Sequence, residues 1–449
     1  MGLIVRPGNP LRGTVRMPGD KSLSHRAALL AALAEGESVI DNFLESGVTR
    51  VMLNALTSVG VEIDLQGERL TVNGRGLHGM QTPTGVLDCG NSATSMRMLA
   101  GALAAAGIPA VLDGSSGLRR RPMDRIVEPL RRMGVPISAS ENGTAPLQLQ
   151  TRSPDSPLEP LHVDLPVASA QVKSCLLLAA LAADPSSGET VIREPGPSRD
   201  HTERMLRKQG VVVTSDMVEV DGNQVYETRM LPGKPLRPLR TALPGDISAA
   251  AFFIVAAAVT PGSAVCIQDV LLNPTRTGLI DALRAMGANI IVDLKSEEVG
   301  GEPVGDVMVC AADLHSTTVN GALVVRMIDE FSAFGAAAAF AAGTSVVQDA
   351  VELRHKESDR ITTLCQELGR LGIQANESAD GFTIKGGRAK SGSVNAHGDH
   401  RLAMAMALIG LGGDGPVRVQ GAQIIEESNP GFAAMLRSLG ADISEVASL

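Results

Sequence analysis

The chain has 449 residues, a formal net charge of −9 and 44% hydrophobic residues, with no Trp and one Tyr. This length is too great for one ordinary hydrophobic core, so we expect several domains, and the negative charge argues against nucleic acid as the main partner. The five cysteines are scattered singly, which fits neither a disulfide framework nor a zinc site and suits a reducing compartment.

The first ten residues lack the long apolar segment of a signal peptide, and the longest apolar run, 249–259, is too short to span a bilayer. From these features we expect a cytoplasmic protein without a membrane segment.

In chain order, the first informative stretch is PGDKSLSHR, residues 18–26. A Pro-Gly turn, short hydroxyl side chains and two cations, Lys21 and Arg26, stand before an Ala/Leu run at 27–34 that predicts a tightly packed helix. Helix N-termini bind anions, and Arg offers a two-pronged fork to carboxylate or phosphate. Taken alone, the stretch is better explained as a capped surface helix.

The chain is built from repeats. An apolar pattern at i, i+1, i+4 and i+7, followed by Gly at i+8 and a β-like run, is typical of one helix face with a left-handed Gly stop. This pattern recurs about every 75 residues, although the third copy matches only in part. Its glycines are Gly60, Gly134, Gly210, Gly287, Gly372 and Gly440.

Each repeat also contains an earlier Ala-rich helix. These helices are predicted to begin near Ser24, Ser92, Ser169, Ile247, Phe331 and His400. Most are followed by Gly and a β-branched run, so each repeat is predicted as helix, strand, helix, strand and extra strands. Small side chains let other elements approach closely, and we therefore expect the helices inside and the sheets outside.

The six repeats divide naturally into two halves. PGD at 18–20 recurs as PGD at 244–246, after a Pro-rich stretch at 231–244. We predict hinge crossings near 18–20 and 243–246. One domain would then comprise residues 20–244, and the other residues 245–449 together with 1–19, whose N-terminal segment is expected to pair with the second half.

Charged and polar residues gather at the starts of the buried helices, where they are costly unless they face a cleft. In addition, Arg119–Arg121 follow a Gly/Ser turn, and Lys356 and Arg360 are predicted to share the face of a helix as i,i+4 neighbours. The sequence has no GxGxxG after a strand, no P-loop, no HExxH and no GxSxG elbow. These features favour a site without metal or cofactor for small, strongly anionic ligands.

Nine motifs in order resemble the 5-enolpyruvylshikimate-3-phosphate synthases over essentially the whole chain. They are PGDKSLSHR, GNSATSMR, RRRPMDR, SAQVKS, SRDHTE, NPTRTG, MIDE, HKESDR and GDHRLAMA. The resemblance implies a two-domain inside-out α/β barrel, with three βαβαββ-type repeats in each domain that close over the substrate. It also implies transfer of the enolpyruvyl group of phosphoenolpyruvate to the 5-hydroxyl of shikimate 3-phosphate, with release of phosphate.

The resemblance further implies roles for individual residues. Those carried over for phosphoenolpyruvate are Lys21, Ala93, Arg121, Gln171, Lys356, Arg360 and Arg401. Those carried over for shikimate 3-phosphate are Lys21, Ser22, Arg26, Ser169, Ala170, Gln171, Ser198, Asp329 and Lys356. Asp329 and Glu357, assisted by Lys21, are the implied acid and base. No metal, cofactor, nucleic acid or membrane is implied, and we expect a monomer.

Four positions depart from the pattern of many members. Ala93 stands where many have Gly, Ala170 where many have Ser, and His201 where many have Tyr; a Lys near the C-terminus corresponds to Glu427. The roles of His201 and Glu427 stay open. Such changes resemble the branch of the family that tolerates glyphosate.

Two alternatives differ in function. The sister family transfers enolpyruvate to UDP-N-acetylglucosamine and typically carries a reactive Cys in the loop that here spans residues 116–121, where this sequence has none. A non-catalytic repeat scaffold would need no acids and bases at equivalent helix starts.

Overall fold

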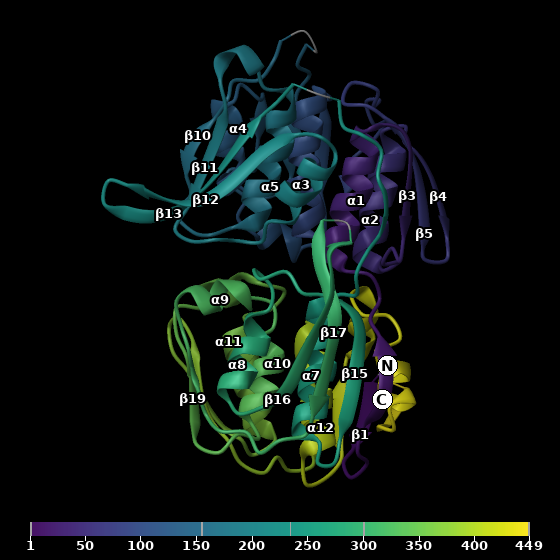
Figure 1. The fold of residues 1–449 in the computed structure, drawn as a ribbon, viewed down its shortest axis with the longest axis vertical. Helices are drawn as coiled ribbons and strands as arrows, with labels where there is room; N and C mark the ends of the chain where they lie inside the picture. The colour runs from purple at the N-terminus through teal and green to yellow at the C-terminus, as the bar shows by residue number, and fades with distance from the viewer. Residues whose placement is uncertain (1, 154–155, 234, 300, 448–449) are drawn as a thin grey trace. The chain divides into compact units, whose positions relative to one another are not determined.

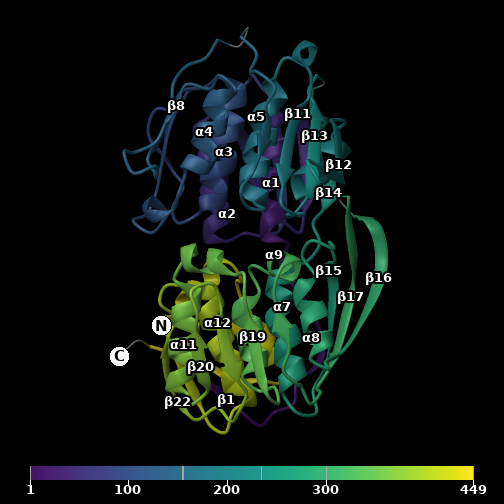
Figure 2. The same ribbon diagram turned by 90° about the vertical axis from the view of Figure 1, so that its left-hand side faces the viewer.

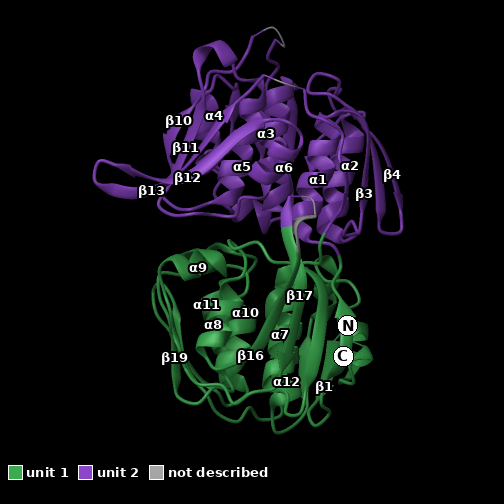
Figure 3. Ribbon diagram, viewed as in Figure 1, with its two compact units in different colours: residues 1–18, 244–298, 303–449 green, residues 19–243, 299–302 purple. Residues whose placement is uncertain are grey.

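The computed structural model describes residues 2–153, 156–233, 235–299 and 301–447. The described chain divides into two compact units (Figure 3). Unit 1 comprises 1–18, 244–298 and 303–449, and unit 2 comprises 19–243 and 299–302. The sequence placed the boundaries at 19/20 and 244/245. The units exchange at 18/19 and 243/244, and residues 299–302 are also assigned to unit 2. Hinge motion at these points stays a prediction.

Six four-stranded sheets are present in the described part of the chain, three in each unit. In unit 2 their orders are β14 (Arg240–Ala242), β3 (Glu35–Asp41), β5 (Arg69–Arg75), β4 (Glu62–Gln66); β6 (Leu87–Asp88), β7 (Ala110–Asp113), β9 (Leu147–Leu149), β8 (Ile137–Ser138); and β10 (His162–Asp164), β11 (Thr190–Glu194), β13 (Asn223–Leu231), β12 (Val212–Val220). In unit 1 they are β16 (Asn289–Val299), β17 (Glu302–Cys310), β15 (Ala264–Leu271), β2 (Arg12–Arg16); β18 (Thr318–Val319), β19 (Thr344–Val347), β21 (Phe382–Lys385), β20 (Gln374–Glu377); and β22 (Gly392–Asn395), β23 (Val417–Gln420), β1 (Gly2–Arg6), β24 (Asp442–Val446).

The helices alternate with these strands. Unit 2 contains α1 (Lys21–Leu33), α2 (Gly47–Ser58), α3 (Ala93–Ala106), α4 (Asp124–Arg132), α5 (Ala170–Ala179) and α6 (His201–Lys208), with 3₁₀ helices at Leu118–Arg120, Ala180–Ala182 and Pro185–Ser187. Unit 1 contains α7 (Ile247–Val259), α8 (Gly278–Ala285), α9 (Ala322–Arg326), α10 (Phe331–Ala338), α11 (Arg360–Arg370), α12 (His400–Gly412) and α13 (Phe432–Ser438), with 3₁₀ helices at Val351–His355 and Ala422–Glu427.

Each sheet contains one parallel pair of strands. The pairs are β14–β3, β6–β7, β10–β11, β2–β15, β18–β19 and β22–β23. Parallel neighbours need a crossover connection. In four of the sheets the Ala-rich helix of the repeat supplies it, whereas β14–β3 and β2–β15 pair strands that lie far apart in the sequence. The second repeat, β6-α3-β7-α4-β8-β9, shows the βαβαββ order in one continuous segment.

Three strands join repeats that are distant in sequence. β14 pairs with β3 of the first repeat, β2 pairs with β15 of the fourth, and β1 lies between β23 and β24 of the sixth. Both N-terminal strands therefore pair with the second half of the chain.

The Ala-rich helices form the interior of each unit. In α7, every residue from Ile247 to Ala258 is buried, and α10 and α12 are buried almost as completely. Figure 1 shows α1, α3 and α5 of unit 2 with β3–β5 on one side and β10–β12 on the other. Figure 2 shows α7 and α12 of unit 1 with β20 and β22 on one side and β15–β17 on the other. Helices that are apolar on all sides are stable only inside a core, and the inside-out α/β barrel predicted from the sequence is confirmed.

The Gly stops also have the predicted geometry. The second helix of each repeat ends just before a glycine with φ between +82° and +107°, a backbone conformation that L side chains rarely adopt. These residues are Gly60, Gly134, Gly210, Gly287, Gly372 and Gly440. The third copy, which matched only in part by sequence, behaves like the others. In the described ranges, no helix is long and apolar enough to cross a membrane.

Candidate active site

Residues 21–26 of the motif at 18–26 form the first turns of α1, and residues 18–20 precede the helix. Asp20 caps the helix by accepting a hydrogen bond from the backbone N–H of Leu23 at 2.9 Å, so Lys21 and Ser22 occupy the first turn. The sequence placed this helix three residues later, at Ser24. The difference arises because the Asp20 carboxylate satisfies an N–H of the first turn, which lets the helix begin at once.

Arg26 is buried and held by three neighbouring segments. Its guanidinium donates to Thr202 Oγ1 and Ser174 Oγ, both at 2.8 Å, and to the carbonyl of Ser22 at 3.1 Å. The two hydroxyls lie 2.6 Å apart, and they come from α6 and α5. Arg26 is therefore fixed in one orientation at the junction of α1, α5 and α6.

The starts of α3 and α5 meet at Gln171. Arg97 donates to Gln171 Oε1 at 2.5 Å, and Gln171 Nε2 donates to Thr94 Oγ1 at 2.8 Å. Ala93, the first residue of α3, is only 3% exposed, and Ser92 caps the helix by accepting from the N–H of Ser95. The GNSATSMR and SAQVKS motifs, 77 residues apart at Thr94 and Gln171, are thus one structural group.

Of the three consecutive arginines, Arg119 and Arg121 have different contacts. Arg119 is paired with Asp113 through Nε at 2.8 Å, and this hydrogen bond lowers the pKa of the Asp113 carboxyl. Arg121 is half-buried and directly follows the 3₁₀ helix, and the carbonyl of the next residue, Pro122, accepts from Arg97 at 2.9 Å. Arg121 therefore lies beside the group formed by Arg97, Gln171 and Thr94. Arg119 instead forms an ion pair with Asp113 at the surface.

Ser169 and Ser198 converge on one buried carboxylate. The N–H of Ser169 donates to Glu194 Oε1 at 2.7 Å, and Ser198 Oγ donates to Glu194 Oε2 at 2.9 Å. Ala170 is the first residue of α5 and is half-buried. Glu194 was not selected by the sequence analysis, because nothing in its local pattern distinguishes it from an ordinary strand residue.

In unit 1, three cations surround Asp329. Lys356 Nζ lies 3.4 Å from Asp329 Oδ1, and Arg360 lies 3.7 Å from the same oxygen. Arg401 donates to the Asp329 carbonyl at 2.5 Å and lies 3.7 Å from its carboxylate. Three of the five cations predicted for phosphoenolpyruvate, one just before α11 and one at the start of each of α11 and α12, thus lie around one predicted catalytic acid.

Arg360 is almost completely buried and is paired twice more. It donates to Glu357 at 2.7 Å and to Asp399 at 2.7 and 3.2 Å. Burial opposes the charged guanidinium, but the charges of Asp399, Glu357 and Asp329 outweigh it and raise the pKa of Arg360. These carboxylates keep Arg360 charged and in place.

Lys356 and Arg360 do not share a helix, so this prediction was wrong. α11 begins only at Arg360, because Asp359 caps it by accepting from the N–H groups of Ile361 and Thr362, each at 3.1 Å. Lys356 instead follows the 3₁₀ helix Val351–His355 in an extended conformation. Both side chains reach Asp329 from separate segments.

The two open positions have structural partners. His201 is fully buried, and its Nδ1 is hydrogen-bonded to Glu302 Oε1 at 2.7 Å. Glu427 ends the 3₁₀ helix Ala422–Glu427 and is half-buried. One group of side chains could in principle hold a metal ion, because the potential ligand atoms of Asp200, His201 and Glu302 lie within 4.8 Å of one another. However, Arg204 donates to Asp200 at 2.8 Å and lies 3.7 Å from Glu302. A cation is therefore already present at this cluster.

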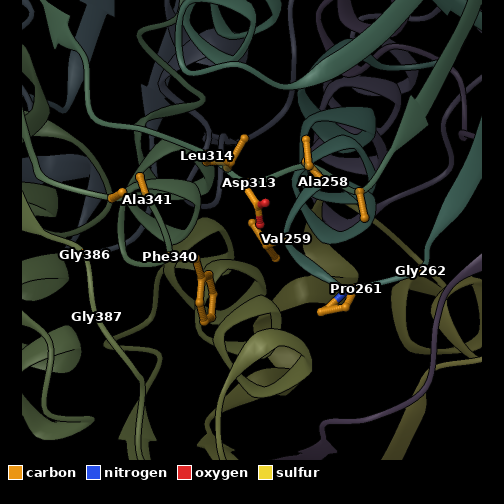
Figure 4. Close-up of a pocket in the computed structure, with 13 residues that line it drawn as sticks. Ala258, Val259, Pro261, Gly262, Asp313, Leu314, Phe340, Ala341, Gly386 and Gly387 are labelled. Carbon is orange, nitrogen blue, oxygen red and sulfur yellow. The ribbon is translucent and has the colours of Figure 1, made fainter.

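A cavity of about 740 Å³ in unit 1 contains none of the predicted site residues (Figure 4). It lies beyond the C-terminal ends of α7 and α10 and is lined by Val259, Pro261, Phe340 and Gly387, with Asp313 as its charged side chain. Helix C-termini carry partial negative charge, so this cavity is unsuited to phosphorylated or carboxylated ligands.

Comparison with known proteins gives a consistent result. Residues 5–436 match the family model described as EPSP synthase (3-phosphoshikimate 1-carboxyvinyltransferase). The chain is 44% identical to the 3-phosphoshikimate 1-carboxyvinyltransferase of Methylococcus capsulatus over 438 residues, 97% of each chain, and 47% identical to that of Xanthomonas axonopodis pv. citri over 438 residues, 97% of this chain and 96% of the relative. The solved EPSP synthase from Acinetobacter baumannii superposes with a TM-score of 0.85 at 38% identity, covering 100% of both chains. The chain belongs to the EPSP synthase family.

Proposed function

We propose that this chain transfers the enolpyruvyl group of phosphoenolpyruvate to the 5-hydroxyl of shikimate 3-phosphate and releases phosphate. Family membership supports the proposal, and the observation that carries it is the group of Lys356, Arg360 and Arg401 around Asp329. A ligand with both a phosphate and a carboxylate needs several fixed cations, and the reaction needs an acid and a base beside them.

The proposed residue roles are divided between unit 1 and unit 2. In unit 1, Lys356, Arg360 and Arg401 bind phosphoenolpyruvate, with Lys356 and Asp329 also contacting shikimate 3-phosphate. In unit 2, the residues proposed to contact phosphoenolpyruvate are Lys21, Ala93, Arg121 and Gln171. The residues of unit 2 that bind shikimate 3-phosphate are Lys21, Ser22, Arg26, Ser169, Ala170, Gln171 and Ser198. The burial and fixed partners of Arg26 and Arg360 support these roles, because binding then costs little side-chain entropy.

The chemistry is an addition followed by an elimination. A base takes the proton of the 5-hydroxyl as its oxygen bonds to C2 of phosphoenolpyruvate, and an acid protonates the methylene carbon. The resulting tetrahedral intermediate loses a methyl proton and expels phosphate. Asp329 and Glu357, with Lys21, are the groups proposed to move these protons, and the surrounding cations stabilise the developing negative charge.

One assay tests the function. Phosphate release is measured with phosphoenolpyruvate plus shikimate 3-phosphate, and in parallel with phosphoenolpyruvate plus UDP-N-acetylglucosamine. We expect turnover only in the first mixture. Turnover in the second mixture alone would replace this proposal with the sister activity, whose loop Cys is missing from residues 116–121.

We further propose that the enzyme tolerates glyphosate because of Ala93. The methyl group begins α3 and is buried, one residue before Thr94, which contacts Gln171. A rigid, packed site penalises an extra methyl by about 1–3 kcal/mol for a ligand that needs the space. Glyphosate is longer than phosphoenolpyruvate and should experience most of this penalty.

We also propose that the protein is a cytoplasmic monomer. All five cysteines lie in the described part of the chain and have free thiols, three of them buried. Burial raises the pKa of Cys89 and of Cys175 to about 12, so these thiols stay protonated and unreactive in a reducing compartment. Gel filtration with light scattering tests the monomer.

A further inference from the structure

A fully buried ion cluster in unit 2 lies directly behind two of the proposed shikimate 3-phosphate ligands. Lys173 Nζ lies 2.7 Å from Glu194 Oε2 and 2.8 Å from Glu203 Oε1, and all three side chains have no exposed surface. Lys173 comes from α5, Glu194 from β11 and Glu203 from α6. Nζ also lies 5.3 Å from the centre of the Tyr226 ring.

A contribution to the stability of the fold does not explain why these three charged side chains are buried together. Taking charges out of water is costly, and replacing a buried ion pair with apolar side chains of similar volume is often neutral or stabilising. The two acids differ in what else they contact. Glu203 is paired with Lys173, whereas Glu194 also accepts from the N–H of Ser169 at 2.7 Å and from Ser198 Oγ at 2.9 Å.

Glu194 holds two ligand-bearing segments through its two oxygens. Ser169 is the N-cap of α5, but its side chain does not cap that helix. Its backbone is instead fixed by Glu194, which leaves the hydroxyl available to a ligand. Ser198 lies in the loop between β11 and α6, and its hydroxyl is oriented by the other oxygen of the same carboxylate.

We propose that Glu194, held in place by Lys173, is a positioning residue that sets the distance and orientation of Ser169 and Ser198 for phosphate recognition. The proposal rests on the proposed function and on the phosphate-binding roles of the two serines. Only a carboxylate fits, because it presents two acceptors. An amide in its place would direct its N–H₂ group at either the N–H of Ser169 or the ammonium of Lys173, and both of these are donors.

The electrostatics of the cluster support a fixed rather than a mobile carboxylate. Burial disfavours the charged ammonium, but the charges of Glu203 and Glu194 outweigh it and raise the pKa of Lys173. Lys173 therefore stays charged at neutral pH and keeps Glu194 in position when the single hydroxyl hydrogen of Ser198 turns from Glu194 to a phosphate oxygen.

The test compares Glu194→Gln with the matched control Glu203→Gln. Each variant removes one buried negative charge from Lys173, but only the first changes a contact with Ser169 and Ser198. We expect Glu194→Gln to raise KM and Kd for shikimate 3-phosphate about tenfold or more, with KM for phosphoenolpyruvate changed less than about twofold. Glu203→Gln should keep both KM values near those of the wild type, whatever its effect on the midpoint of unfolding.

A double-mutant cycle with Ser198→Ala adds a second measurement. If Glu194 acts through Ser198, the affinity lost in the double variant should be clearly smaller than the sum of the two single losses. Equal effects of Glu194→Gln and Glu203→Gln on KM, an unchanged Kd for shikimate 3-phosphate in Glu194→Gln, or full additivity in the cycle would overturn the proposal. Failure of the wild type to turn over shikimate 3-phosphate would instead contradict the proposed function.

Discussion

Replacing Asp399 with Asn removes one charge from the cluster around Arg360 and leaves the start of α12 intact. Asp399 Oδ1 accepts from the N–H of Arg401 at 2.9 Å, and Asn caps helices as well as Asp does. Its other oxygen accepts from Arg360 Nε at 2.7 Å, and an amide there would place a donor against a donor. The substitution therefore changes mainly the contacts of Oδ2, which are the one with Arg360 and a hydrogen bond from Ser358 Oγ at 3.2 Å.

The magnitude follows from burial. Asp399 has no exposed side-chain surface and Arg360 has 3%. Removing one partner of a buried pair costs about 3–5 kcal/mol. Glu357 still pairs with Arg360 at 2.7 Å, so we expect the lower part of this range, about 3 kcal/mol, in the free energy of unfolding. With Arg360 less well held, KM for phosphoenolpyruvate should rise about tenfold.

Asp359→Asn is the matched control. Asp359 caps α11 in the same way and pairs with Arg354 at 2.7 Å, but 36% of its side chain is exposed. We expect a loss below about 1 kcal/mol and no change in KM. Urea unfolding followed by circular dichroism gives the stability, since the chain has no Trp and one Tyr to report by fluorescence. If both variants change KM for phosphoenolpyruvate equally, Asp399 does not position Arg360 for binding.

Three further predictions concern individual side chains. Burial lowers the pKa of His25 from 6.5 to about 4, so this group stabilises the fold above pH 6.5 and its contribution is lost as the pH falls toward 4. In urea titrations, the free energy of unfolding of the wild type should fall by about 2 kcal/mol more than that of His25→Asn between pH 7 and pH 5. Ala93→Gly should restore glyphosate inhibition, with an inhibition constant against phosphoenolpyruvate roughly 5- to 150-fold lower; equal constants would make the methyl purely structural. Glu357→Gln should lower kcat about 100-fold or more if the carboxyl transfers protons, whereas an unchanged kcat would leave Glu357 as an ion-pair partner of Arg360.

Much of the candidate site could be predicted because its residues stand in local motifs. Lys21, Ser22 and Arg26 were found from a single stretch, and the Asp caps at Asp20, Asp246 and Asp399 repeat at equivalent helix starts. What local motifs could not reveal was which acid holds which cation. The SAQVKS motif contains Lys173, yet its partners Glu194 and Glu203 come from separate elements.

The sequence by itself determined the repeat, its helices and its Gly stops, because these depend on interactions within a few residues. A helix face recurs every three to four positions, and a stop such as Gly372 needs only the backbone freedom of the glycine itself. The expected pairing of the N-terminal segment with the second half is confirmed, but only the tertiary structure decided that β1 pairs with β23 and β24, that β2 pairs with β15, and that β14 completes the first sheet. It also decided that Lys356 and Arg360 reach Asp329 from different segments. The physical reason is that strand pairing and the packing of buried charges join residues tens to hundreds of positions apart, where short-range periodicity carries no information.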